Sequence, residues 1–299
     1  MGDGQPGTEP AAKRRRVHAP GSWWAEMDDF VRAVSGAFVV ATPLLYTTEM
    51  WVLGVSVERG KLLLFLAVAV AISLGLARSR TGGFREGTSG FAVVEQAIDG
   101  VAVGVVGALV VLLVLNRIAI GDPLDSIVGK VAIQAVPLAI GAAVANAIFG
   151  PDRQGGRQGD DNGNAPATAW QALRSDLGAT VVGALFIAIT IAPTDEIALL
   201  AAGMDVKHEL ALVALSLVLT YTIVFASGLG EGQHEQPGPF QHPITETVLA
   251  YAVSLLVALA TLFLFDRIGA GDSLHHVVTM VLVLGLPAAV GGAAGRLVV

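Results

Sequence analysis

The 299-residue chain contains no cysteine, and only 14% of its residues are charged. The absence of cysteine excludes disulfides, thiolate metal sites, cysteine nucleophiles and lipid attachment through sulfur. Soluble domains have about 25% charged residues, whereas this chain is 54% hydrophobic and has a mean hydropathy of +0.67. A composition of this kind is typical of a membrane protein.

Recognised catalytic motifs are also absent. The chain has no Gly-x-Ser-x-Gly, no His-Glu-x-x-His and no phosphate-binding Gly-Lys-Ser/Thr, and its histidines do not follow the spacing of known metal sites. We therefore expect no enzyme activity, no metal and no cofactor. The basic cluster at residues 13–16 lies in a polar segment without a folded basic surface, so nucleic acid is not an expected partner.

The few charges are biased in sign and type. The formal net charge is −7, and the basic residues are 14 arginines against 4 lysines. Together with the abundance of Ala, Val and Gly, this bias resembles the composition of proteins from salt-loving archaea. Acidic loops in high salt are a solubility property and do not indicate a basic ligand.

Long apolar segments fill most of the chain, and most of them approach or exceed the 17–25 residues that cross a bilayer as a helix. They do not show the repeated hairpin turns of a membrane barrel. We expect an all-α, polytopic membrane bundle of about eight transmembrane helices. The eight segments lie near residues 30–54, 62–77, 92–115, 126–149, 177–203, 209–227, 246–265 and 275–298.

The polar connections predict the orientation of the bundle. With the amino terminus inside, 11 basic residues fall on inner segments and 5 on outer loops, which favours two cytoplasmic termini in the cell membrane. Residues 1–28 are then a disordered basic tail, and residues 151–175 are a cytoplasmic linker between two four-helix units at 29–150 and 176–299.

The two units are related by duplication. At an offset of 150, residues 116–141 and 266–291 share ten identities in 26 aligned positions. At an offset of 147, Thr47 aligns with Thr194 and Glu49 with Glu196. Because each unit has four spans, both units enter the bilayer from the same side, and the repeats are parallel.

The aligned carboxylates are the main candidate site. Thr47 and Glu49, and Thr194, Asp195 and Glu196, each lie near the end of an apolar run. Both glutamates would be about 30 Å along their helices, at the outer edge of the hydrocarbon. They could be hydrated interfacial carboxylates. Alternatively, helix breaks at prolines turn them into an outward-facing cavity that binds a cation or proton; the prolines involved are Pro43 and Pro193.

Two outer loops repeat the pattern Arg-Ile-x-x-Gly-Asp at Arg117 and Arg267. One interpretation is a tight turn in which Gly supplies the unusual dihedral, Asp caps the next helix, and Arg pairs with a carboxylate or extends to the surface. Another is that the arginines bind Glu49 and Glu196 across the outer face. Pro137 and Pro287 lie within apolar spans and are candidate hinges, with close helix packing as the other interpretation.

The stretches at residues 43–51 and 183–197 resemble a family of bacterial and archaeal multi-pass integral membrane proteins that has no assigned activity. The resemblance covers about residues 28–299 and implies a multi-pass fold. It carries over no substrate and no site residue.

These observations predict a duplicated membrane protein that moves a small solute or ion, a cation or proton, as a transporter or channel. The alternative is a non-transporting scaffold or sensor that acts through partners at the segments 151–174 and 228–245. The lipid bilayer is the one certain partner of such a chain, and the sequence does not indicate an oligomeric state.

Overall fold

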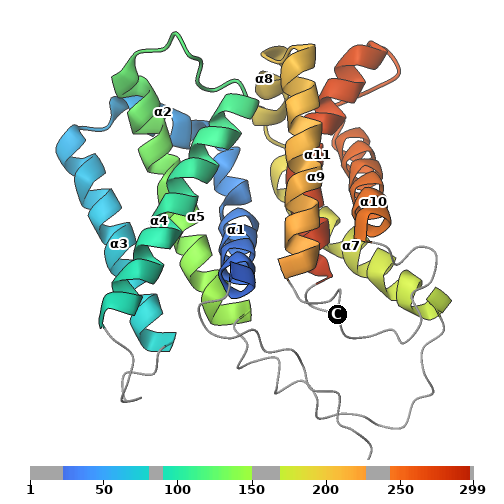
Figure 1. The fold of residues 1–299 in the computed structure, drawn as a ribbon. Helices are drawn as coiled ribbons and strands as arrows, with labels where there is room; N and C mark the ends of the chain where they lie inside the picture. The colour runs from blue at the N-terminus through green and yellow to red at the C-terminus, as the bar shows by residue number, and fades with distance from the viewer. Residues whose placement is uncertain (1–22, 81–89, 150–168, 227–242, 297–299) are drawn as a thin grey trace, which may run out of the picture.

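The computed structural model describes residues 23–80, 90–149, 169–226 and 243–296, and these residues form ten helices and no strand (Figure 1). The predicted linker and the 228–245 segment lie largely outside the described residues, as do residues 1–22 of the predicted tail. The helices are α1 (Trp23–Leu45), α2 (Thr48–Ser56), α3 (Arg59–Arg80), α4 (Gly90–Val114), α5 (Leu124–Phe149), α7 (Ala169–Ile191), α8 (Glu196–Ala202), α9 (Val206–Ala226), α10 (Pro243–Leu264) and α11 (Leu274–Gly295).

Two of the eight predicted spans are broken. The segment 30–54 forms α1 and α2, which meet at an angle of 87°, and the segment 177–203 forms α7 and α8. Within the described residues, six helices are long and apolar enough to cross a membrane, or seven if α1 and α2 count as one bent span. The all-helical membrane architecture is confirmed, and the count of eight spans is not.

Each half of the chain is built around one buried helix. In the first half α5 packs against α1, α2, α3 and α4, and in the second half α11 packs against α7, α8, α9 and α10. The middle of both helices is buried without interruption, over residues 131–139 and 283–293. The outer helices instead expose large apolar side chains such as Phe186 and Val182, as expected where a surface faces lipid.

Glycines allow the buried helices to approach their neighbours closely. A Cβ on Gly141 of α5 would lie 2.9 Å from the Cα of Ala37 in α1, and a Cβ on Gly183 of α7 would lie 2.9 Å from the Cα of Gly295 in α11. Both distances are too short for a real side chain. Small residues therefore set the helix separation, which is the usual means of helix association in membranes.

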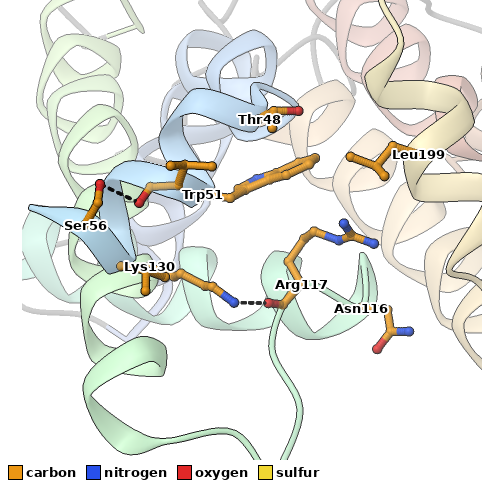
Figure 2. A pocket seen from close by; sticks show the side chains of 9 residues that line it. Thr48, Trp51, Ser56, Asn116, Arg117, Lys130 and Leu199 are labelled. Carbon is orange, nitrogen blue, oxygen red and sulfur yellow. Dashed lines mark hydrogen bonds between the residues drawn. The ribbon is translucent and has the colours of Figure 1, made fainter.

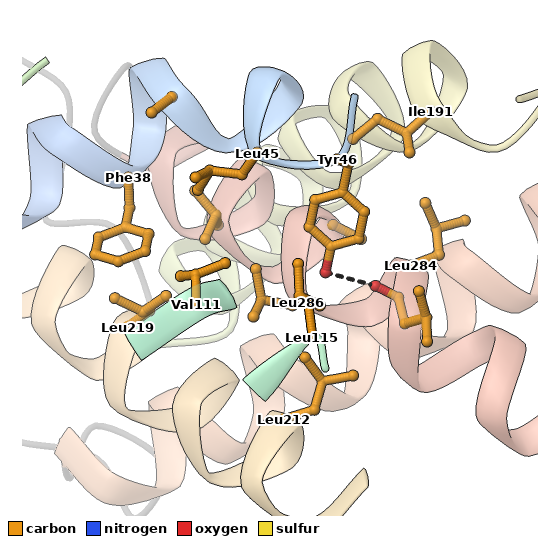
Figure 3. Close-up of a cluster of buried hydrophobic side chains, with 14 of the residues drawn as sticks. Phe38, Leu45, Tyr46, Val111, Leu115, Ile191, Leu212, Leu219, Leu284 and Leu286 are labelled. Atoms are coloured by element: carbon orange, nitrogen blue, oxygen red, sulfur yellow. Dashed lines mark hydrogen bonds between the residues drawn. The ribbon is translucent and has the colours of Figure 1, made fainter. Parts of the chain in front are cut away.

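The halves share one apolar core, drawn in Figure 3 with side chains from both. Helix α1 carries most of the contact between them, because it packs on α9, α11 and α7. One hydrogen bond crosses the core, from the Tyr46 hydroxyl to the Val283 carbonyl at 2.9 Å. Near the middle of α1, the Ser35 hydroxyl lies 3.4 Å from the Thr222 carbonyl of α9.

The two ends of the bundle differ. Helices α2 and α8 and the turns 115–123 and 265–273 lie at one end, which we call the α2–α8 end (Figure 1). The N-terminal end of α1 and the C-terminal end of α11 lie at the opposite end. There Arg296 pairs with Asp176 of α7 at 3.1 Å, which ties the last described residue to the helix that α11 packs on.

The glycine contacts generate a stability prediction. Gly183→Ala should lower the free energy of unfolding by about 1–3 kcal/mol, because the new methyl group would meet the backbone of α11. Gly178 lies in the same helix with nothing within 4 Å of a Cβ, so Gly178→Ala should be neutral or stabilising by up to about 1 kcal/mol. Unfolding in detergent, followed by circular dichroism, measures both. Equal effects of the two substitutions would contradict the close packing.

Candidate functional site

The break between α1 and α2 is closed by local hydrogen bonds. Pro43 lies in the last turn of α1, where it removes one backbone donor and its ring crowds the carbonyl four residues earlier. Thr47 then adopts an extended backbone (φ −92°, ψ 121°). The Thr47 hydroxyl donates to the Pro43 carbonyl at 3.1 Å, and the Trp51 indole donates to the Leu45 carbonyl at 3.0 Å. The carbonyls released by the break therefore keep partners.

The break between α7 and α8 has a different anchor. Thr194 donates from its hydroxyl to the Ile191 carbonyl at 2.7 Å, which closes the end of α7. Arg267, from the turn before α11, donates to Asp195 Oδ1 at 2.7 Å and also to the Pro193 carbonyl. The ion pair thus joins the two polar turns of the second half.

The structure separates the two aligned glutamates. Glu49 is exposed on α2. Glu196 lies beside the other half of the chain, where its carboxylate interacts with the hydroxyl and the backbone amide of Thr48. Partial burial raises the pKa of Glu196, but the hydrogen bonds from Thr194, from its own amide and from Thr48 outweigh burial, and the pKa is lowered from 4.5. Glu196 therefore links α8 to α2 electrostatically, and we call this contact the clasp.

The arginine turns differ from their predicted geometry. In the described part of the chain, the non-glycine residues with positive φ are Asn116 (53°) and Asp266 (54°), which follow α4 and α10 in the left-handed conformation that asparagine and aspartate tolerate. Gly121 and Gly271, which were predicted to supply the unusual dihedral, do not have a φ in the left-handed region. Asp122 accepts from the Ala119 amide at 3.0 Å and so closes its own turn rather than capping the next helix. Asp272 does the same with the Gly269 amide at 2.7 Å.

Neither arginine pairs with the glutamate that was one of its predicted partners. Arg267 binds Asp195. Arg117 places its guanidinium 5.2 Å from the centre of the Trp51 ring, and its Nε donates to the Leu115 carbonyl at 3.2 Å. Partial burial lowers the pKa of Arg117 from its ordinary value, and an arginine stays protonated at neutral pH.

A pocket of about 550 Å³ opens beside Arg117 at the α2–α8 end (Figure 2). Residues of α2, the 115–123 turn and α5 line it, with Leu199 of α8 from the other half. Lys130 extends from α5 and donates to the Arg117 carbonyl at 2.8 Å. The lining residues are Thr48, Trp51, Val52, Val55, Ser56, Asn116, Arg117, Lys130 and Leu199.

Comparison with known families agrees with this architecture. A family model described as "Putative integral membrane protein (DUF2391)" matches residues 29–299. The chain belongs to this family. The resemblance seen in the sequence is thereby confirmed, and the chain is an integral membrane protein. No curated protein and no solved structure matches it.

For this member of the family, the candidate hinges do not interrupt their helices. Pro137 lies inside α5 and Pro287 inside α11, and both helices continue through the proline as single elements. Both prolines are buried. A hinge at either position stays a prediction, whereas the breaks near Pro43 and Pro193 are present in the structure.

One buried carboxylate was missed by sequence reasoning. Glu209 lies at the start of α9 and is only 9% exposed. The Thr279 hydroxyl of α11 donates to Glu209 Oε1 at 2.5 Å, and His275 Nδ1 lies 3.9 Å from the same oxygen. Sequence alone does not reveal this site, because Glu209 begins the predicted span 209–227 and its partners lie about 70 residues further along the chain. Among the described residues, no group of three or more His, Asp or Glu could hold a metal.

The clasp generates a pH prediction. A depressed pKa means that the carboxylate stabilises the fold fully above the unfolded pKa, and that this stabilisation is lost as the pH falls through the folded pKa. Glu196→Gln should therefore cost about 1 kcal/mol at pH 7, a value reduced for solvent screening. The difference from the unsubstituted protein should shrink below about pH 4. Unfolding titrations across pH measure it.

Glu58→Gln provides the matched control. Glu58 is an exposed glutamate in the α2–α3 turn at the same end of the bundle. Its substitution should change the free energy of unfolding by less than about 0.5 kcal/mol at pH 7. A Glu196→Gln effect that is no larger than that of the control would argue against the clasp.

Proposed function

We propose that the chain is a membrane transport protein that moves a small solute or an ion, either as a transporter or as a channel. The observation that carries the proposal is the pair of broken helices at the α2–α8 end. Helix α2 has nine residues, or about 13 Å, and α8 has seven; neither can cross a bilayer. Broken helices are characteristic of substrate sites in transporters, because their free ends provide polar groups.

The inferred duplication supports a shared path between two halves. The offset of 147 aligns the break after α1 with the break after α7, and the offset of 150 aligns Asn116 with Asp266, which have the same unusual φ. The close contact of Gly36 with Gly141 corresponds to that of Gly183 with Gly291. Parallel repeats of this kind surround a common axis in many transport folds.

In this proposal the candidate cation or proton groups remain Glu49 and Glu196, with unequal roles. Glu49 is exposed on α2. Glu196 is bound to Thr48 of the opposite half, so a change in its protonation would loosen the contact between the halves. We place the α2–α8 end outside and both termini in the cytoplasm, following the distribution of basic residues.

Flux measurements test the proposal. The purified protein in proteoliposomes should dissipate an imposed gradient of protons or of an alkali cation faster than empty liposomes do. Substituting both glutamates, Glu49→Gln with Glu196→Gln, should reduce that flux by about tenfold or more, because the carboxylates that bind the ion are removed. A pH-sensitive or potassium-sensitive dye enclosed in the vesicles measures the rate.

Glu58→Gln again controls for the loss of a negative charge at this end. It should leave the flux within about twofold of the unsubstituted rate. Unchanged flux in the double variant would remove the two glutamates from the mechanism. Rates equal to empty liposomes for protons, alkali cations and small anions would argue against transport altogether.

A further inference from the structure

The pocket at the α2–α8 end has a distinctive charge. Two of its nine lining residues, Arg117 and Lys130, are cationic, and none is acidic. The polar lining groups of Thr48, Ser56 and Asn116 are neutral. Its volume of about 550 Å³ is within the usual range for small-molecule sites. The pocket thus combines positive charge with room for an organic molecule.

Arg117 has hydrogen-bonding capacity left for a ligand. It stacks on Trp51 at 5.2 Å and uses Nε for the Leu115 carbonyl. Among the described residues, no carboxylate lies within ion-pairing distance of its guanidinium. A partly buried charge without a counter-ion is unfavourable, and an anion in the pocket would remove that cost.

Lys130 adds a second donor to the same space. Its ammonium donates to the Arg117 carbonyl at 2.8 Å, and an ammonium group carries two further N–H groups. Because Lys130 also has no ion pair among the described residues, both pocket cations lack an acidic partner there. Glu196 binds Thr48 at the edge of this region, but it does not line the pocket.

The aligned positions of the second half show how the same turn can be neutralised. Arg267 aligns with Arg117, and its carboxylate partner Asp195 aligns with Thr48. The position of Lys130 is occupied by Met280, which is buried. The first half therefore has two cations where the second half has an internal ion pair and an apolar side chain. The first-half site is therefore more positive than the aligned second-half site by two charges, so its charge is not a general property of this turn.

We propose that this pocket binds a small organic anion, with a carboxylate or phosphate group between Arg117 and Lys130. The apolar part of the molecule would pack on Trp51, Val52 and Val55 of α2 and on Leu199 of α8. A guanidinium and an ammonium are the usual pair of donors for such oxyanions. The proposal does not depend on transport, because binding at equilibrium can be measured without flux.

Trp51 provides the signal for the test. The chain has four tryptophans, so Trp23, Trp24 and Trp170 are replaced by Phe to leave Trp51 as the only emitter. Butyrate and inorganic phosphate are titrated into the protein in a neutral detergent, with tetramethylammonium as the cationic comparison. We expect a saturable change in Trp51 fluorescence with at least one anion and none with the cation.

Substitutions assign the response to the pocket. Arg117→Gln and Lys130→Met should each weaken binding by about tenfold or more, since each removes a charge-assisted hydrogen bond. Arg267→Gln removes the same charge from the aligned turn, where the arginine already has a carboxylate, and should change the affinity by less than about threefold. Thermal unfolding without ligand shows that each variant is folded.

A lipid headgroup carries the same oxyanion chemistry as a soluble phosphate, so a second arm separates the two sources. The protein is placed in nanodiscs of phosphatidylcholine with or without phosphatidylglycerol. A Trp51 response to phosphatidylglycerol alone, lost in Arg117→Gln, supports the anion site and assigns its ligand to the bilayer. Absence of a response to every anion, or equal binding by Arg117→Gln and the unsubstituted protein, would overturn the proposal.

Discussion

Backbone groups inside a bilayer have no water to bind, and this constraint accounts for most of the architecture. It explains why the described residues form helices joined by short turns, and why buried hydroxyls donate to carbonyls of their own helices. Ser216 and Thr220, for example, each donate to the carbonyl four residues earlier at 2.7 Å. It also explains why the interruptions of α1 and α7 lie at the α2–α8 end, where turns, threonine hydroxyls and Arg267 satisfy the released carbonyls.

Hydropathy predicted where the helices lie, because a segment's stability in lipid depends mainly on how apolar its residues are and little on their order within the segment. It could not separate α1 from α2, since Tyr46 and Trp51 are as apolar as their neighbours and only Pro43 signals a break. The contact between Glu196 and Thr48 was also beyond prediction, because it depends on how the two halves pack.

Small differences between aligned positions give similar turns different chemistry. Asp266 and Asn116 have nearly the same φ, and the following arginines begin from equivalent places. Asp195 neutralises one arginine, whereas the other has Thr48 at the aligned position and stacks on Trp51. The alignment alone suggested that both arginines behave alike. The sequence shows that Thr48 aligns with Asp195. Only the structure shows that this position lies close enough to the arginine turn to decide whether the arginine has a carboxylate partner.

Thr48 contacts both the pocket and Glu196, so anion binding in the pocket and protonation of Glu196 are thermodynamically linked. It lines the pocket beside Arg117 and it interacts with the Glu196 carboxylate. Protonation of Glu196 removes the negative charge that Thr48 binds, so it changes the electrostatic potential at the pocket wall. Coupling between two sites is reciprocal. If an anion binds more tightly when Glu196 is protonated, anion binding must raise the pKa of Glu196 by a corresponding amount, and a membrane protein could use that linkage to couple an anion to a proton.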